Sequence, residues 1–107
     1  MSQVGTPIDL ERLRSRRDEI LRRAAERGAR NVRVFGSTAR GEARAVSDVD
    51  LLVEMEPGRS MLDFVGLWQD LQELLGTGVD LVSEGGISPY LREKGKGEKI
   101  LSEAVAL

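Results

Sequence analysis

At 107 residues and 40% hydrophobic content, the chain is long enough for one modest core and too short for a second lobe. It has no cysteine and no histidine, which excludes disulfides, thiolate or histidine metal sites and histidine-based catalysis. The net charge of −2 is uneven, because residues 1–50 carry 11 Arg and Lys against 8 Asp and Glu, while residues 51–107 carry 5 against 10. Any catalytic chemistry must therefore rely on carboxylates, hydroxyls and cationic side chains. The uneven charge argues against a protein that coats nucleic acid without sequence preference.

The longest apolar run has four residues, and the N-terminus has no apolar signal segment. We therefore expect a soluble cytoplasmic protein with no membrane span. The basic excess lies mostly between Arg12 and Arg33, where Asp18, Glu19 and Glu26 alternate with arginines. This pattern favours a solvated helix face, and contact with RNA or an acidic partner is the alternative.

A first helix is predicted to start at Thr6, with Thr6 as the N-cap, Pro7 at the first helical position and Asp9 in the first turn. Gly28 is placed to end it. Apolar residues at helical spacing mark its buried face: Leu10, Leu13, Ile20, Leu21 and Ala24.

Two strands are predicted at residues 31–35 and 47–55, with a short helix around residues 38–43 between them. Pro57-Gly58 breaks the chain, and Ser60 with Asp63 is typical of the start of a second long helix. We expect the apolar stripe of that helix to lie in the core rather than on a binding surface; its members are Met61, Phe64, Val65, Trp68, Leu71 and Leu75.

Gly76 and Gly78 end the second long helix, and residues 79–83 read as a third strand. Ser88-Pro89 is typical of a helix start, and residues 98–107 are predicted to form a final helix or a terminal strand. Because no repeat, linker or low-complexity segment interrupts the chain, we expect residues 1–107 to form a single α/β domain.

Two carboxylates, Asp48 and Asp50, stand one residue apart at the start of the second strand. Side chains at positions i and i+2 of a strand point to the same side, so both carboxylates project together. They repel each other unless a cation lies between them, and hard divalent ions such as Mg²⁺ prefer oxygen ligands. The pair therefore predicts a metal site.

Gly36-Ser37 follows a strand and precedes a helix start, where backbone N–H groups favour an anion such as phosphate. Phosphate and metal together indicate a nucleoside triphosphate. Asp80 interrupts the third apolar strand, and it could share the metals or accept a proton from an attacking hydroxyl. Each feature alone also fits an ordinary surface pair, a turn or an exposed edge residue, and only their ordered combination favours a site.

The run from Gly36 to Gly41, GSTARG, followed by SDVDL at residues 47–51, resembles the signature of the polymerase-β-like nucleotidyltransferases. Size and order are most similar to the minimal nucleotidyltransferases, the MntA-like proteins. This resemblance implies a mixed-sheet α/β fold with helices packed on the sheet, two Mg²⁺ ions and nucleotidyl transfer from a triphosphate to an acceptor hydroxyl. It implies that Gly36 and Ser37 hold the triphosphate and that Asp48, Asp50 and Asp80 bind the metals.

Arg40 also lies in the signature, and the resemblance places it near the phosphates. The alternative is that Arg40 pairs with a nearby carboxylate and holds the loop. Sequence alone does not separate the two roles.

The resemblance also implies a partner. MntA-like proteins are antitoxins of type VII pairs whose toxin is a helical HEPN ribonuclease, and they transfer AMP from ATP to a tyrosine of that toxin. Two alternatives stay open: an antitoxin that blocks its toxin by contact alone, and a catalytic subunit that modifies a small molecule together with a helical partner. Direct nucleic-acid binding is not expected.

Overall fold

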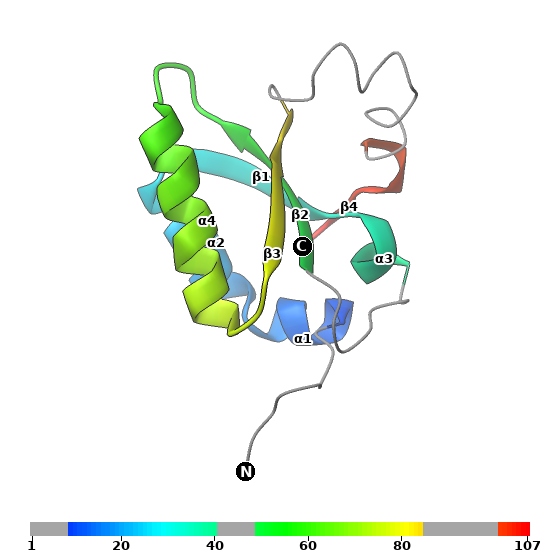
Figure 1. Ribbon diagram of the computed structural model, residues 1–107. Coiled ribbons are helices and arrows are strands. Elements are labelled where there is room, and N and C mark those ends of the chain that lie inside the picture. Colours follow the sequence, from blue (N-terminus) through cyan, green and yellow to red (C-terminus); the bar gives the residue numbers. More distant parts are fainter. Residues whose placement is uncertain (1–8, 41–48, 85–100) are drawn as a thin grey trace.

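The computed structural model describes residues 9–40, 49–84 and 101–107. These residues form a mixed four-stranded sheet, and α2 and α4 lie side by side against it (Figure 1). The fold class predicted from the sequence is confirmed. In chain order the elements are α1 (Leu10–Ser15), α2 (Arg17–Glu26), β1 (Ala29–Val34), α3 (Gly36–Ala39), β2 (Val49–Met55), α4 (Met61–Leu75), β3 (Val79–Ser83) and β4 (Val105–Ala106).

The strand order is β3-β2-β1-β4. β2 pairs with β3 in parallel, whereas β1 pairs with β2 and with β4 in antiparallel fashion. β3 has the bounds that the sequence predicted, and β1 starts and ends earlier than predicted. The described part of β2 starts at Val49, because residues 41–48 lie outside the described residues. α4 makes the crossover that two parallel strands require.

The first helix differs from its prediction in two ways. It starts at Leu10, later than predicted, since Asp9 is the N-cap and its carboxylate accepts a hydrogen bond of 2.9 Å from the Arg12 backbone N–H. The predicted cap residues Thr6 and Pro7 lie outside the described residues. It also breaks at Arg16, whose φ of −106° and ψ of 15° separate α1 from α2. Gly28, with a φ of +77°, follows the end of α2 as predicted.

α3 starts at Gly36, two residues before the predicted helix around residues 38–43. The extended backbone of Phe35 supplies its N-cap, and Arg40 follows its last residue. The rest of the predicted range, residues 41–43, lies outside the described residues. α3 is therefore a single turn directly after β1.

The start of α4 is as predicted, with a capping box made by Ser60 and Asp63. The prediction that the apolar stripe of α4 lies in the core is wrong in part, because Met61, Val65 and Trp68 are exposed. The helix has apolar residues on more than one side, and periodicity alone cannot decide which side packs on the sheet. The side that does so presents two fully buried leucines, Leu67 and Leu71.

Buried side chains lie on both faces of the sheet. The main core joins one face to α1, α2 and α4; it contains Leu13, Ile20, Ala24, Val32, Val34, Val49, Leu51, Val53, Leu67, Leu71 and Val79, among others. A smaller cluster on the opposite face contains Phe35 and Leu52, with Leu101 and Ala104 packed against it. Residues 101–103 are helical and β4 follows, so the described part of the segment predicted at residues 98–107 contains both helix and strand. No helix in the described ranges is long and apolar enough to cross a membrane.

Candidate active site

Asp50 and Asp80 are direct partners in the parallel pairing of β2 with β3. Their neighbours Val49, Leu51 and Val79 belong to the main core, so both carboxylates project from the opposite face of the sheet. Strands in a sheet lie about 4.8 Å apart, which brings two acidic side chains next to each other. Asp80 is exposed and Asp50 is partly buried. Two adjacent carboxylates at this position favour a divalent cation.

Asp48, the third predicted carboxylate, lies outside the described residues. Among residues that are described, no three acidic side chains gather closely enough to hold a metal ion. The described part of the predicted metal site therefore consists of the pair Asp50 and Asp80.

Thr38 was not predicted as a site residue, yet it contacts Asp50 directly. Its side chain is fully buried, and its Oγ1 accepts a hydrogen bond of 3.3 Å from the Asp50 backbone N–H. The same hydroxyl donates to Asp50 Oδ2 at 3.5 Å, a long contact. Thr38 thus holds the Asp50 carboxylate toward α3. In the sequence it looks like any threonine in a short helix, and only its place inside the GSTARG run could have marked it.

Gly36 lies against the Asp50 carboxylate. It has a φ of +62°, and a Cβ built at this position would lie 2.7 Å from Asp50 Oδ2. Phe35 N–H donates to the Asp50 carbonyl at 3.1 Å, which ties the loop before α3 to β2. Ser37 follows as the second residue of α3. The predicted phosphate loop and the predicted metal ligand are therefore direct neighbours.

Arg40 pairs with a carboxylate, as one of its two predicted roles requires. Its Nη1 lies 2.9 Å from Oε1 of Glu103, which is 63 residues away in the chain. Leu101 and Ala104, on either side of Glu103, pack against Phe35 and Leu52. The ion pair thus joins the signature loop to the C-terminal segment, and this contact leaves the predicted phosphate role untested.

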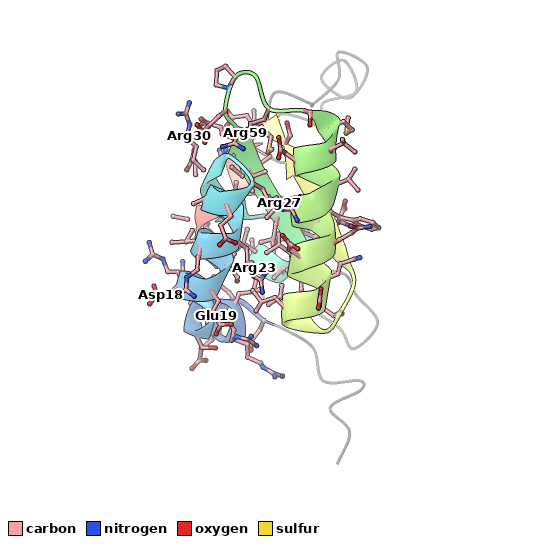
Figure 2. The ribbon with its side chains drawn as sticks, turned by 90° about the vertical axis from the view of Figure 1, so that its left-hand side faces the viewer. Asp18, Glu19, Arg23, Arg27, Arg30 and Arg59 are labelled. Atoms are coloured by element: carbon pink, nitrogen blue, oxygen red, sulfur yellow. The ribbon has the colours of Figure 1, made fainter. Side chains whose placement is uncertain are left out.

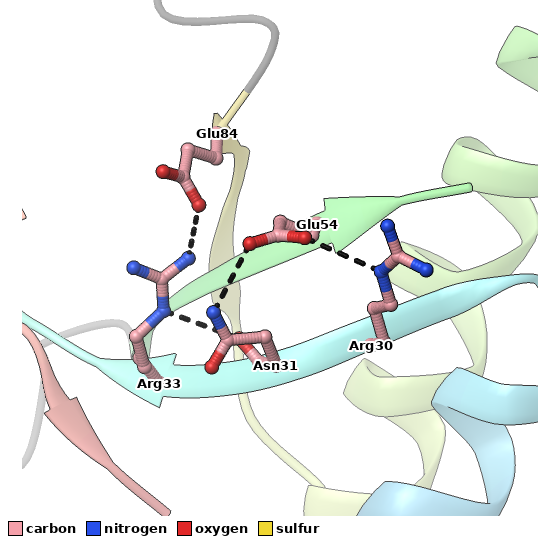
Figure 3. A network of polar contacts seen from close by, with 5 residues as sticks. All are labelled: Arg30, Asn31, Arg33, Glu54 and Glu84. Carbon is pink, nitrogen blue, oxygen red and sulfur yellow. Dashed lines mark hydrogen bonds and ion pairs between the residues drawn. The ribbon is translucent and has the colours of Figure 1, made fainter. Parts of the chain in front are cut away.

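A polar network continues the same face of the sheet (Figure 3). Arg33 Nη2 lies 2.6 Å from Glu84, and Asn31 Nδ2 and Arg30 Nε donate to Glu54 at 3.2 and 3.3 Å. The hydrogen bonds from Asn31 and Arg30 lower the pKa of the Glu54 carboxyl. No pattern in the sequence predicts this network, because its members come from three different strands or their ends.

The basic stretch around α2 is largely exposed to solvent, and the arginines at its two ends form ion pairs (Figure 2). Arg16 pairs with Glu19 at 3.0 Å on the helix surface. Arg27 reaches α4, where its Nε lies 3.0 Å from Asp70, and this hydrogen bond raises the pKa of Arg27. Both contacts agree with the solvated-face interpretation.

Comparison with known proteins gives a family. The nucleotidyltransferase domain family matches residues 17–105. The chain belongs to this family. Protein adenylyltransferase MntA of Thermococcus cleftensis is 42% identical over 78 residues, which cover 73% of this chain and 74% of that protein. A relative from Methanocaldococcus jannaschii, provisionally named a protein adenylyltransferase, is also 42% identical over 78 residues, covering 73% of this chain and 78% of its own length.

Solved structures agree. One provisionally described as a minimal nucleotidyltransferase has 51% sequence identity and a TM-score of 0.79, and the match covers 96% of this chain and 100% of that one. A toxin–antitoxin complex crystallised with AMP-PNP has a TM-score of 0.67 at 21% identity, covering 83% of this chain and 69% of that one. At that identity the likeness shows the fold alone. The predicted family and the predicted enzyme class, nucleotidyltransferase, are confirmed.

Proposed function

We propose that this nucleotidyltransferase transfers AMP from ATP to a tyrosine hydroxyl of a helical, HEPN-type toxin, and so acts as the antitoxin of a type VII pair in the cytoplasm. The Thermococcus cleftensis relative is named a protein adenylyltransferase, and toxin–antitoxin complexes share the fold. The observation that carries the proposal is the in-register pair Asp50 and Asp80, placed beside Gly36 of the signature loop.

The residues fit a divalent cation site. Asp50 and Asp80 are adjacent oxygen donors on one sheet face, and hard divalent cations prefer such oxygen ligands. We propose that Asp48 completes the set and that the three carboxylates hold two Mg²⁺ ions. When bound, Mg²⁺ neutralises the phosphate charge and stabilises the oxygens of an in-line displacement.

The triphosphate is proposed to lie along Gly36, Ser37 and Arg40. Gly36 has no side chain, so its backbone lies directly beside the Asp50 carboxylate. Serine at position 37 supplies a hydroxyl donor, and arginine at position 40 supplies a permanent cation. The one-turn length of α3 means that backbone N–H groups, rather than a long helix dipole, must supply the remaining contacts.

In the proposed reaction the acceptor oxygen forms a bond to the α-phosphorus of ATP, and the bond from that phosphorus to the bridging oxygen of pyrophosphate breaks. The proton of the hydroxyl goes to a carboxylate, because the chain has no histidine. Asp80 is exposed on the edge strand β3 and is the described carboxylate best placed to receive an acceptor.

The test uses ATP labelled at the α-phosphate, the purified chain and the purified partner toxin, sought among the products of neighbouring genes. We expect the label on a tyrosine of the toxin, and no label with the Asp50→Asn variant. Neutralisation of the toxin without label would instead identify an antitoxin that acts by contact. Label on a small molecule in the presence of the helical partner would identify the third candidate, a small-molecule transferase.

A further inference from the structure

Four large apolar side chains are exposed on one side of α4. Met61 and Leu62 are 72% and 81% exposed, and Val65 and Trp68 are 37% and 38% exposed. Their spacing of one, three and three residues puts them on one side of the helix, which we call the α4 apolar face. In the described part of the chain only one other large apolar residue, Val105, is similarly exposed. Contiguous exposed apolar surface of this kind marks an interaction site.

The α4 apolar face lies next to the strand that carries Asp80. Trp68 Nε1 donates to the Val79 carbonyl at 2.8 Å, and Gln72 Oε1 accepts from the Val79 N–H at 3.3 Å. These two bonds fix α4 to the first residue of β3, one position before Asp80. Since β3 is an edge strand, a protein seated on α4 needs to reach only around one strand to meet the site face.

The unpaired charge beside this face is acidic. α4 contains no lysine or arginine, and helical spacing places the exposed Glu73 at the edge of the face. The other two acids of α4 lie on the far side of the helix and are paired, Asp63 with Arg59 and Asp70 with Arg27. Glu73 and Asp80 have no ion pair among the described residues. Unpaired carboxylates repel phosphate backbones and anionic lipid, and they attract a basic protein surface.

A second copy of the chain does not offer a matching surface. Its basic helices, α1 and α2, expose no large apolar side chain in the described residues. They could therefore complement the acidic charge beside α4 but could not cover the α4 apolar face. An α4-to-α4 contact matches the apolar area and offers no cation to Glu73, because α4 has no lysine or arginine. A different protein can supply apolar and basic side chains on the same segment.

We infer that the α4 apolar face is the docking surface for the protein acceptor, and that it takes an amphipathic helix of the partner whose apolar side chains are flanked by Lys or Arg. This inference rests on the proposed function, since it assigns the surface to the protein that receives AMP. Docking on α4 would hold the acceptor tyrosine at the β3 edge, close to Asp80. A surface outside the reacting atoms would then select the acceptor.

The test measures binding of the purified toxin by the full chain and by two variants. Leu62→Glu places a charge at the most exposed apolar side chain of the α4 apolar face, and Ala25→Glu places the same charge on the exposed surface of α2 as a matched control. We expect Leu62→Glu to weaken toxin binding about tenfold or more, because it replaces an apolar contact by a charge, and Ala25→Glu to leave it unchanged. Glu73→Lys should weaken binding less, and the loss should shrink at high salt because a rim charge is screened.

Binding of Mg-ATP, measured by thermal stabilisation, separates the two proposals. If Leu62→Glu keeps Mg-ATP binding and loses both toxin binding and label transfer, the docking surface is supported. If Leu62→Glu binds the toxin as the wild type does, the inference is overturned even where transfer proceeds. If the chain alone forms dimers in sedimentation and Leu62→Glu abolishes them, the face belongs to a second copy and the inference is also overturned. Absence of Mg-ATP binding by the wild type would instead contradict the proposed function.

Discussion

Gly36 and Asp50 are so close that a single added carbon at Gly36 would lie 2.7 Å from the Asp50 carboxylate. Replacement of Gly36 by alanine should therefore disturb the protein in two ways. The φ of +62° costs an L-residue about 1 to 2 kcal/mol, and the Cβ must also displace Asp50. Gly58, with a φ of +88° and no atom within 4 Å of a built Cβ, is the matched control. We expect Gly36→Ala and Gly58→Ala to lower the melting temperature, and only Gly36→Ala to lose stabilisation by Mg-ATP. Equal Mg-ATP responses in both variants would contradict the placement of the site.

The hydroxyl of Thr38 satisfies the Asp50 N–H in a buried position. Thr38→Val keeps the shape and removes both hydrogen bonds, so it should lower the free energy of unfolding by about 1 to 3 kcal/mol. Thr38→Val should also bind Mg-ATP more weakly than the wild type, whereas Thr38→Ser keeps the hydroxyl and should bind it normally. Chemical denaturation measures the free energy of unfolding, and thermal shift measures the binding of Mg-ATP. If Thr38→Val binds Mg-ATP as tightly as Thr38→Ser does, Thr38 does not position the carboxylate.

Asp80 and Asp50 should respond differently to amide substitution. Asp80→Asn is expected to retain most Mg-ATP binding and to slow transfer about 10² to 10⁴-fold, the range for loss of a general base. Asp50→Asn should lose the stabilisation by Mg-ATP as well as transfer. Without metal, Asp50→Asn should be at least as stable as the wild type, because it relieves repulsion between two adjacent carboxylates. Wild-type transfer by Asp80→Asn across the pH range would make Asp80 an ordinary strand residue.

The two predicted roles of Arg40 can be separated through its partner Glu103. The pair is partly exposed, and such ion pairs contribute at most about 1 kcal/mol, so Glu103→Gln and Arg40→Gln should each lower stability only slightly. If Arg40 also contacts phosphate, Arg40→Gln alone should raise the KM for ATP substantially. Similar KM values for the two variants would leave Arg40 with a structural role only.

The acid sensitivity of the fold should include a contribution from Glu54. Its pKa is lowered in the folded state by hydrogen bonds from Asn31 and Arg30, so its ionised form stabilises the fold above its unfolded pKa. That contribution should fade as the pH falls through the folded pKa, below about 4.3, the ordinary value for glutamate. Glu54→Gln should be less stable than the wild type at neutral pH, and the difference should shrink in acid. A difference that stays constant with pH would contradict this assignment.

Local signals in the sequence predicted the local structure well. The capping box at Ser60, the glycine after α2 and the bounds of β3 each depend on residues next to one another, and all three are confirmed. The break at Arg16 was not predicted, because its residue types suit a continuous helix.

Contacts between segments that are distant in the chain could not be predicted from the sequence. Which side of α4 packs on the sheet depends on how the helix is placed over β2 and β3, and its apolar residues allow more than one answer. The bonds from Thr38 to Asp50 and from Arg40 to Glu103 depend on how α3 and the C-terminal segment meet the sheet. The position of Asp80 next to Asp50 follows from the parallel, in-register pairing of β2 with β3, which no local signal in the sequence predicts.

Trp68 is the only tryptophan in the chain, and it stands on the α4 apolar face with its indole N–H bonded to the first residue of β3. All tryptophan fluorescence of the protein therefore comes from this one place. Its emission should respond when a partner without tryptophan covers α4, whereas Mg-ATP on the opposite face should change it little. The unlabelled protein thus contains its own optical reporter, which tests the proposed docking on α4 separately from the proposed nucleotide site.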